Sequence, residues 1–219
     1  MFSCCCHAQA AGGLFSRFAK YYRHRYRWLG LEPSQRQLVQ GLSKVGYQGA
    51  SLLEIGCGVG YLHQWLVKHG AAKAVGVDLS AGMLQEAWEL AAEQGLDSKV
   101  SYRQGDYTEL ARDLASADIV ILDKVICCYP DVDTLLASAS ENANRVIALT
   151  YPRIHLLTRM GMGLLNRLLA LSGSHFRTYL HRPDHVQKQL SSLGWDKAYE
   201  ASTTMWLSQI YLARSALID

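Results

Sequence analysis

The sequence lacks several features that mark other classes of protein. No apolar run reaches the roughly 20 residues that a membrane-spanning helix needs. The chain does not start with a basic segment followed by a long apolar stretch, so we expect no secretory signal and a cytoplasmic protein. A net charge of +3 on 219 residues does not favour nucleic acid as a partner. There is no internal repeat, and 49% apolar residues suffice for the core of one domain.

The six cysteines fall into a pattern that does not match a familiar metal site. C-x-x-C spacing, typical of zinc sites, is absent, and adjacent cysteines rarely form a disulfide with each other. In a reducing compartment we therefore expect free thiols, and we predict no metal site. Thiolates select soft ions, so a site for a soft metal or metalloid stays open as an alternative. It would combine Cys4-Cys5-Cys6-His7 with Cys127-Cys128.

The first residues are expected to precede the folded domain. Residues 1–13 are small and polar and end in two glycines, which predicts a flexible, cysteine-rich leader. Residues 14–219 are expected to form a single domain. Two helices within residues 14–46 begin it: an aromatic and basic helix over 14–28, and one that starts at Pro33, a residue suited to a first helical turn.

From residue 51 onward, short apolar runs alternate with helical patterns. Such alternation indicates βαβ units and a parallel sheet covered by helices on both faces. The strands are predicted at 51–55, 74–78, 100–103, 119–122 and 145–150. The helices between them are predicted at 60–68, 81–94, 108–114 and 132–142.

The chain after the fifth strand departs from this alternation. Helices are expected over 153–171 and 183–193. Two strands at 195–199 and 205–213 are close enough in sequence to form an antiparallel pair at the sheet edge. The fold is therefore predicted as α/β, a doubly wound sheet of seven mostly parallel strands. A helical insert over 153–172 is expected to lie over the site as a lid.

That insert carries Arg153, Arg159 and Arg167 on an otherwise hydrophobic helix. Such a helix suits an amphiphilic substrate that bears carboxylates, or peripheral contact with a membrane surface. A plain covering helix with a solvated polar face is an equally open interpretation.

The chemistry of the sequence concentrates after the first predicted strand, in the segment Glu54-Ile55-Gly56-Cys57-Gly58-Val59-Gly60. Its three glycines, Gly56, Gly58 and Gly60, allow a tight turn and let a ligand approach bare backbone. Glu54 favours a cationic or amino-bearing ligand and opposes a pyrophosphate. A dinucleotide site would want glycine at the position of Tyr61, so hydride-transfer enzymes fit poorly.

Carboxylates follow the next two predicted strands. Asp78, beside Leu79, can accept hydrogen bonds from both hydroxyls of a ribose. Asp106 could accept a hydrogen bond from an adenine amino group, and Tyr107 could cover the ring. All of these residues lie at the carboxyl ends of parallel strands, where doubly wound sheets bind ligands.

The segments LLEIGCGVGYL, AVGVDLSAGML, QGDYTEL and ADIVILDKVICCYP resemble, in order, the motifs of class I S-adenosylmethionine-dependent methyltransferases. The resemblance covers roughly residues 50–150 and implies a Rossmann-like methyltransferase that binds S-adenosylmethionine. It implies that Glu54 and Gly56 lie near the methionine moiety and that Asp78 lies at the ribose. Asp106 and Tyr107 would lie at the adenine.

The methyl acceptor is less clearly marked, because transfer from a sulfonium needs alignment in a dry pocket more than it needs a base. Asp123 and Tyr129 follow the fourth strand, beside the methyl group in this fold. Together with Tyr22 of the first helix they are the candidate catalytic residues, and Asp123 is also a candidate cofactor contact. We expect Cys127 and Cys128 to be small core residues.

More narrowly, the chain resembles the magnesium-protoporphyrin O-methyltransferases. The resemblance rests on the aromatic and basic first helix with Tyr21 and Tyr22, the Tyr129-Pro130 pair and the helical insert. That family has an Ile-His-Tyr-Pro stretch after strand four, whereas this chain has Cys128 at the position of the histidine. The resemblance therefore implies a small-molecule acceptor, such as a carboxylated hydrophobic one, rather than the porphyrin itself.

Other functions stay open on the sequence alone. A degenerate pocket would make the chain a non-catalytic S-adenosylmethionine-binding module, although the intact carboxylates argue against it. Methylation of a thiol-bound metalloid would use the cysteines. RNA methylation would rest on the basic first helix, but an Asn-Pro-Pro-Tyr-like motif is absent. A base or an acceptor contact could come from one of His175, His181 and His185. The sequence does not predict an oligomeric state.

Overall fold

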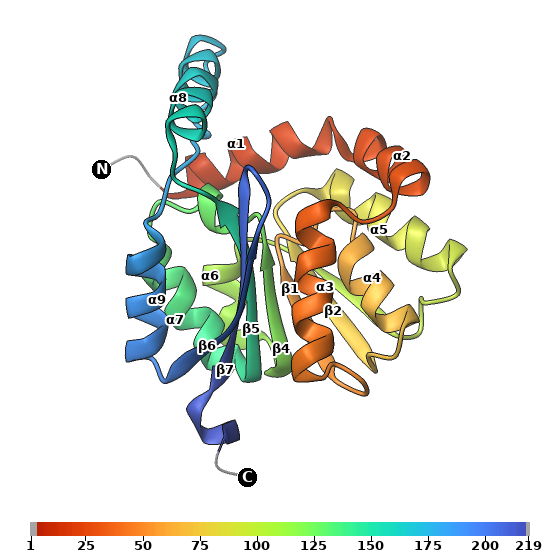
Figure 1. Ribbon diagram of the computed structural model, residues 1–219. Helices are drawn as coiled ribbons and strands as arrows, with labels where there is room; N and C mark the ends of the chain where they lie inside the picture. Colours follow the sequence, from red (N-terminus) through yellow and green to blue (C-terminus); the bar gives the residue numbers. More distant parts are fainter. Residues whose placement is uncertain (1–3, 218–219) are drawn as a thin grey trace.

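The computed structural model describes the chain from residue 4 to residue 217, and side chains from residue 10 to residue 215. Within these residues one seven-stranded sheet forms, in the order β3-β2-β1-β4-β5-β7-β6 (Figure 1). Its strands are β1 (Ser51–Ile55), β2 (Lys73–Asp78), β3 (Val100–Gln104), β4 (Ala117–Asp123), β5 (Ala143–Pro152), β6 (Trp195–Ser202) and β7 (Trp206–Ala213). Strands β1 to β5 run parallel, and β7 runs antiparallel to both β5 and β6. The predicted fold class is therefore confirmed.

Two layers of helices cover the sheet because successive side chains of each strand point to opposite faces. On one face lie α3 (Pro33–Val45), α4 (Tyr61–Lys68) and α5 (Ala81–Glu93). On the other lie α6 (Tyr107–Leu110), α7 (Val132–Asn142) and α9 (Pro183–Ser192). In β1, for example, Leu52 packs with the first layer and Leu53 with the second. Strand order reverses between β1 and β4, and doubly wound sheets bind ligands outside that point.

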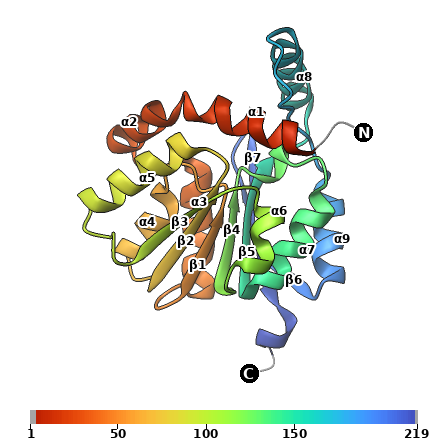
Figure 2. The same ribbon diagram turned by 180° about the vertical axis from the view of Figure 1, so that it is seen from behind.

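The chain before residue 30 forms two helices that lie across the carboxyl end of the sheet, α1 (Cys4–Ser16) and α2 (Ala19–Leu29) (Figures 1 and 2). The predicted flexible leader over 1–13 is therefore wrong for residues 4–13, while residues 1–3 lie outside the described part. Alanine-rich sequence favours a helix here, and Ala11 is buried in a small cluster with Leu169 and Phe176.

The prediction of a single helix over 14–28 is also wrong, because a turn at residues 17–18 separates α1 from α2. Ser16 ends α1, where its hydroxyl lies 2.7 Å from the hydroxyl of Ser80. The turn allows Ala19, at the start of α2, to pack with Val59 and Met83. Arg23 then fastens α2 to α5 through ion pairs with Glu86, Glu89 and Glu93.

The predicted insert forms α8 (Leu156–Leu171), which projects from the body of the molecule (Figures 1 and 2). Thr158 and Leu169 are its buried residues. Among residues 4–217 no helix is long and apolar enough to cross a membrane.

Candidate functional site

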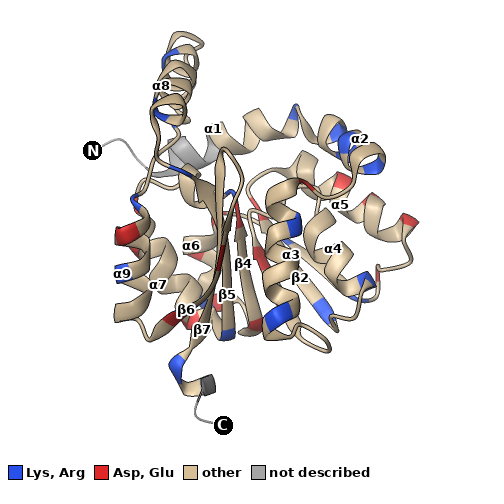
Figure 3. Ribbon diagram, viewed as in Figure 1, with Lys and Arg blue, Asp and Glu red and all other residues tan. Residues whose placement is uncertain are grey.

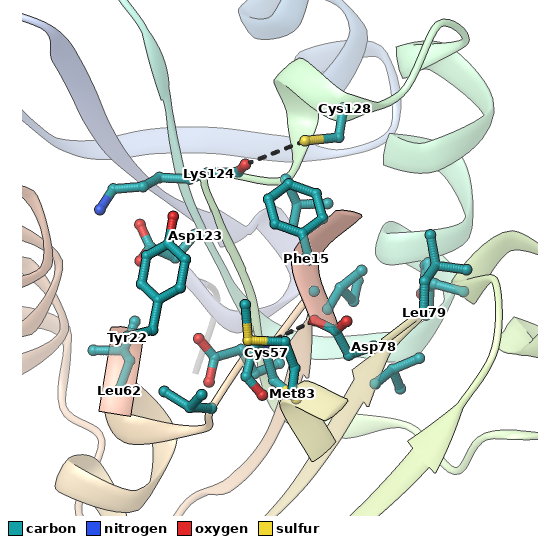
Figure 4. Close-up of a pocket in the computed structure, with 18 of the residues that line it drawn as sticks. Phe15, Tyr22, Cys57, Leu62, Asp78, Leu79, Met83, Asp123, Lys124 and Cys128 are labelled. Atoms are coloured by element: carbon teal, nitrogen blue, oxygen red, sulfur yellow. Dashed lines mark hydrogen bonds between the residues drawn. The ribbon is translucent and has the colours of Figure 1, made fainter. Parts of the chain in front are cut away.

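A cavity of about 300 Å³ lies at the carboxyl edge of the sheet, around the strand-order reversal (Figure 4). Its floor comes from the loops after β1, β2, β3 and β4, and helices α1 and α2 contribute Ala11, Phe15 and Tyr22. Most of the residues predicted for cofactor binding line it: Glu54, Gly56, Gly58, Asp78, Leu79, Tyr107 and Asp123. Gly60 and Asp106 adjoin lining residues without lining the cavity themselves.

The glycine turn after β1 serves both packing and access. Gly56 has a φ of 61°, and a Cβ added there would lie 2.0 Å from Cγ2 of Val125. Gly58 has a φ of 54°, but an added Cβ would meet nothing within 4 Å. Glycine at 56 is therefore required by the neighbouring chain, whereas Gly58 presents bare backbone to the cavity, where a ligand can approach it.

Asp78, at the end of β2, holds this turn in place. Its Oδ2 accepts a hydrogen bond from the Gly58 amide at 2.8 Å, and its Oδ1 accepts one from the Ser80 amide at 2.8 Å. Burial raises the pKa of the Asp78 carboxyl, and these amides oppose that rise by stabilising the charged form. A carboxylate has about four acceptor sites, so lone pairs remain for two ribose hydroxyls.

Glu54 is buried in the cavity wall and has a partner that the sequence did not reveal. His63, on the first turn of α4, places Nδ1 2.6 Å from Oε2 of Glu54, and its backbone amide donates to the same oxygen at 3.3 Å. Burial raises the pKa of Glu54, and the contact with His63 opposes the rise. The two residues are nine positions apart on a strand and a helix, and no sequence pattern marks them as a pair.

The hydrogen bonds around His63 define its tautomer. A carboxylate oxygen only accepts, so Nδ1 of His63 must carry the proton. Nε2 of the ring lies 3.1 Å from the hydroxyl of Tyr102, which already accepts a hydrogen bond from Nε2 of Gln64 at 2.7 Å. The single proton of the Tyr102 hydroxyl has two acceptors in reach, Nε2 of His63 at 3.1 Å and the Ala87 carbonyl oxygen at 3.4 Å, and His63 is the nearer. With Glu54 ionised, both ring nitrogens of His63 have a hydrogen-bond partner in this buried network.

At the end of β3, the structure differs from the predicted arrangement. The Asp106 Oδ1 accepts hydrogen bonds from the Thr108 amide at 3.0 Å and from the hydroxyl of Tyr129 at 2.9 Å. Tyr107 is buried, and its hydroxyl donates to Oδ1 of Asn142 on α7 at 2.6 Å. Tyr107 is thus anchored in the core layer, because a buried phenol needs a polar partner. Tyr129 lines the cavity as Asp123 does, and its hydroxyl contacts the predicted adenine contact Asp106; its catalytic role stays a prediction.

Asp123, at the end of β4, lies among residues from the chain that precedes the sheet. Nε2 of Gln35 donates to its Oδ2 at 2.7 Å, while Oδ1 is buried and has no hydrogen-bond partner within residues 10–215. Burial raises the pKa of Asp123, and the Lys124 ammonium opposes the rise. An unpaired buried carboxylate oxygen is costly, so it fits a ligand that brings a donor.

Lys124 supplies a positive charge at the same end of the cavity. Its backbone has a φ of 61°, and its ammonium pairs with Glu32 and lies 5.2 Å from the centre of the Trp206 ring. Glu32 also pairs with Arg25 of α2 at 2.8 Å. Lys124, Gln35 and Trp206 were not predicted as site residues, although Lys124 lies directly after Asp123 in the sequence.

Tyr22 lines the cavity as predicted, and burial together with the charge of Glu32 raises its pKa. The lid prediction is wrong, because no residue of 153–172 lines the cavity. Helix α8 instead projects outward from the molecule, and helices α1 and α2 cover the cavity.

The cysteines and histidines add little to the site. Cys128 lines the cavity, and its contact with Cys127 and burial raise the pKa of its thiol well above the ordinary value. Cys127 is buried, as expected of a core residue. Nε2 of His181 lies 3.0 Å from the Tyr129 carbonyl oxygen, and that of His185 lies 2.7 Å from Oδ1 of Asp133. None of the three candidate histidines lines the cavity.

For the side chains at 10–215, no group of three or more histidine, cysteine, aspartate or glutamate residues could hold a metal ion. The side chains of Cys4, Cys5, Cys6 and His7 lie outside the described residues, so the metalloid site of the sequence analysis stays a prediction.

Comparisons with known proteins agree with this geometry. Residues 53–144 match the family model of a methyltransferase domain. The chain is 28% identical over 196 residues to a ubiquinone biosynthesis O-methyltransferase of Methylococcus capsulatus, covering 82% of this chain and 80% of the relative. It is 28% identical over 172 residues to the chloroplastic magnesium protoporphyrin IX methyltransferase of Arabidopsis thaliana, covering 76% and 52%.

Other matches cover less of the relative or share less sequence. The chain spans only 37% of the ubiquinone biosynthesis O-methyltransferase of Azorhizobium caulinodans, with 38% identity over 97 residues, or 44% of this chain. The crystal structure of magnesium protoporphyrin IX methyltransferase from Synechocystis PCC 6803 with bound SAH superposes with a TM-score of 0.70. At 20% identity, over 94% of this chain and 99% of that one, this likeness concerns the fold.

Proposed function

We propose that this chain, a member of the S-adenosylmethionine-dependent methyltransferases, transfers a methyl group to an oxygen of an apolar small molecule that bears a carboxylate. The observation that carries the proposal is the combination of one cation and an aromatic wall at the end of the cavity opposite the adenine contacts. Lys124 is the one lysine or arginine among the cavity-lining residues, all of which belong to the described part of the chain.

The cofactor half of the cavity fits S-adenosylmethionine. Gly58 leaves backbone bare, Asp78 keeps acceptor sites for the ribose, and the contact of Glu54 with His63 opposes the rise that burial causes in the pKa of Glu54. The free Oδ1 of Asp123 suits an ammonium donor. When bound, S-adenosylmethionine supplies an activated methyl group on a sulfonium. The task left to this chain is to align donor and acceptor and to exclude water.

The acceptor half suits a large, flat or branched apolar molecule. Tyr22, Tyr61 and Trp206 line it with aromatic rings. A carboxylate of the acceptor placed at Lys124 would compete with Glu32 for the ammonium. The acceptor carboxylate is already ionised at neutral pH. An ionised carboxylate has no proton to lose before methyl transfer, so the reaction needs no general base from the cavity wall. An amphiphilic acceptor also fits the peripheral membrane contact expected for residues 153–172.

Methylation of a thiol-bound metalloid is less well supported at the cavity. It would need thiolates, whereas the raised pKa of Cys128 keeps that thiol protonated at neutral pH.

A screen for S-adenosylhomocysteine release tests the proposal, with porphyrin carboxylic acids, quinone-type phenols and arsenite as acceptors. We expect turnover with a carboxylated apolar acceptor. In Lys124→Gln the KM for that acceptor should rise roughly 10- to 100-fold, the equivalent of a lost charged hydrogen bond. Calorimetry with S-adenosylmethionine separates any loss of cofactor affinity, which Lys124 can affect through Asp123, from the loss of acceptor binding; Lys68→Gln, at the far end of α4, is the matched control. Turnover with arsenite alone, or with none of the acceptors, would contradict the proposal.

A further inference from the structure

Helix α8 exposes a continuous apolar stripe to solvent. Leu157, Met160, Leu164, Leu168 and Leu171 follow at intervals of three and four residues, and each is more than half exposed. The opposite side of the helix faces the protein, where Thr158 and Leu169 are buried and Asn166 hydrogen-bonds the backbone of Thr178. The apolar stripe is therefore the outer face of a helix whose inner face is already occupied.

The segment around this stripe carries positive charge only. No aspartate or glutamate occurs between Glu141 and Asp184. Arg159 and Arg167 are exposed on α8, where Figure 3 shows basic and no acidic residues. Neither arginine forms an ion pair with any residue of the described chain.

Helix α2 presents a second surface with exposed apolar and basic residues, beside the acidic residues of α5 that pair with Arg23 and Arg27. Tyr21, Trp28 and Leu29 are each at least 63% exposed, and exposed Arg17 and Lys20 lie among them. The chain has no acidic residue before Glu32. Both views of the molecule place α1, α2 and α8 at the same end, beyond the carboxyl edge of the sheet (Figures 1 and 2). Two distant segments thus contribute apolar and basic groups to one end of the molecule.

We infer that this end of the molecule docks on the surface of an anionic lipid bilayer, with the apolar stripe of α8 and the aromatic residues of α2 in the interface. Apolar side chains at helical spacing, flanked by arginine and lysine, match the composition of helices that lie in the lipid headgroup region. Tryptophan and tyrosine favour the same depth, because one end of each ring is apolar and the other is polar.

A second copy of the chain would be a less favourable binding partner for the apolar stripe than a lipid surface. Pairing α8 with another α8 would bring Arg159 and Arg167 of two chains together without an acidic residue on either helix. An anionic bilayer instead complements those charges and covers an apolar face of any shape. Charge complementarity therefore selects the lipid surface.

Docking in this orientation places the cavity near the lipid. Leu169 of α8 packs with Phe176, which follows the helix, and with Ala11 of α1, and Phe15 and Cys128 lie against the same cluster. Ala11, Phe15 and Cys128 also line the cavity. An apolar acceptor dissolved in the bilayer would thus meet the helix that covers the cavity.

Vesicle flotation with the full chain tests the docking, and it needs neither cofactor nor acceptor, so it is independent of the proposed function. The lipids are phosphatidylcholine alone and phosphatidylcholine with phosphatidylglycerol. We expect strong binding to the anionic vesicles and weak binding to the neutral ones. Arg159→Gln with Arg167→Gln should weaken binding roughly 30-fold, since each cation near an anionic surface contributes about 1 kcal/mol. Lys68→Gln with Lys73→Gln, at the opposite edge of the sheet, is the charge-matched control and should bind as wild type does.

Replacing Leu157, Leu164 and Leu168 with glutamine should abolish binding, a loss of roughly 1000-fold or more, because each buried leucine contributes at least about 1.5 kcal/mol. These side chains are exposed, so the variant should keep the melting temperature of wild type. The inference is overturned if wild type binds neither vesicle, if the glutamine variant still binds, or if the control loses as much as the arginine variant. Self-association through α8, abolished by the glutamine variant and without vesicle binding, would also overturn it.

Discussion

Replacing His63 with alanine tests how Glu54 keeps its charge inside the cavity wall. The side chain of His63 is completely buried, and its Nδ1 lies 2.6 Å from the Glu54 carboxylate. Its removal deletes a hydrogen bond to a charged group, which contributes about 1.5–3 kcal/mol. That hydrogen bond opposes the rise in the pKa of Glu54, so without it the pKa should rise further. Burial already raises that pKa, so His63→Ala should leave Glu54 largely protonated over a wider pH range.

The expected consequence is weaker binding of the cofactor, by roughly 10- to 100-fold in Kd near neutral pH. Isothermal titration calorimetry measures it for both S-adenosylmethionine and S-adenosylhomocysteine. Both carry the amino group of the methionine moiety, so both should weaken alike. Raising the pH should restore part of the affinity in the variant, because Glu54 then ionises. A simple packing defect would not respond to pH in this way.

His69→Ala is the matched control, since His69 follows α4 and stacks on Trp65 outside the network. In Glu54→Gln the carboxylate is gone, so adding His63→Ala should weaken cofactor binding by much less than it does in wild type. The reasoning is refuted if His63→Ala binds the cofactor within about twofold of wild type, or if its loss of affinity is the same at every pH.

Two further predictions concern the stability of the site. Gly56→Ala should destabilise the protein by at least about 2 kcal/mol, because the new Cβ would meet Val125 at 2.0 Å in a left-handed backbone; chemical denaturation measures this, and a second change of Val125→Ala should recover only part of it. Burial raises the pKa of Glu54, Asp78 and Asp123, so each of these carboxyls should reduce the stability of the cofactor-free protein as pH rises from about 4 through its raised value; Asp78→Asn should therefore lose less melting temperature over that window than wild type does, and an equal loss would contradict the pKa shift.

The strands and the glycine turn could be predicted because their signals are local. Apolar runs of four to seven residues separated by helical patterns leave few alternatives to a parallel sheet. Asp78 could be predicted as a site residue because it lies at a strand end. In the structure its carboxylate accepts a hydrogen bond from the Gly58 amide. The glycine pattern and the carboxylates lie within a few residues of those strand ends, so periodicity alone positions them.

The parts that were missed depend on contacts between distant segments. Gln35 reaches Asp123 across 88 positions, and Tyr107 is turned into the core by Asn142 on another helix. For α8, the sequence indicates a stripe but not which side of the helix the protein occupies. That choice is made by Asn166 and its contact with Thr178, which no periodicity encodes.

The central claim is that the glycine turn and Asp78 hold S-adenosylmethionine, and calorimetric titration of wild type and Asp78→Ala tests it most directly. We predict one cofactor per chain for wild type, and an affinity at least roughly 10-fold lower for Asp78→Ala, because two hydrogen bonds between ribose and a carboxylate are lost. Absence of binding by wild type, or equal affinity in a folded Asp78→Ala, would contradict it.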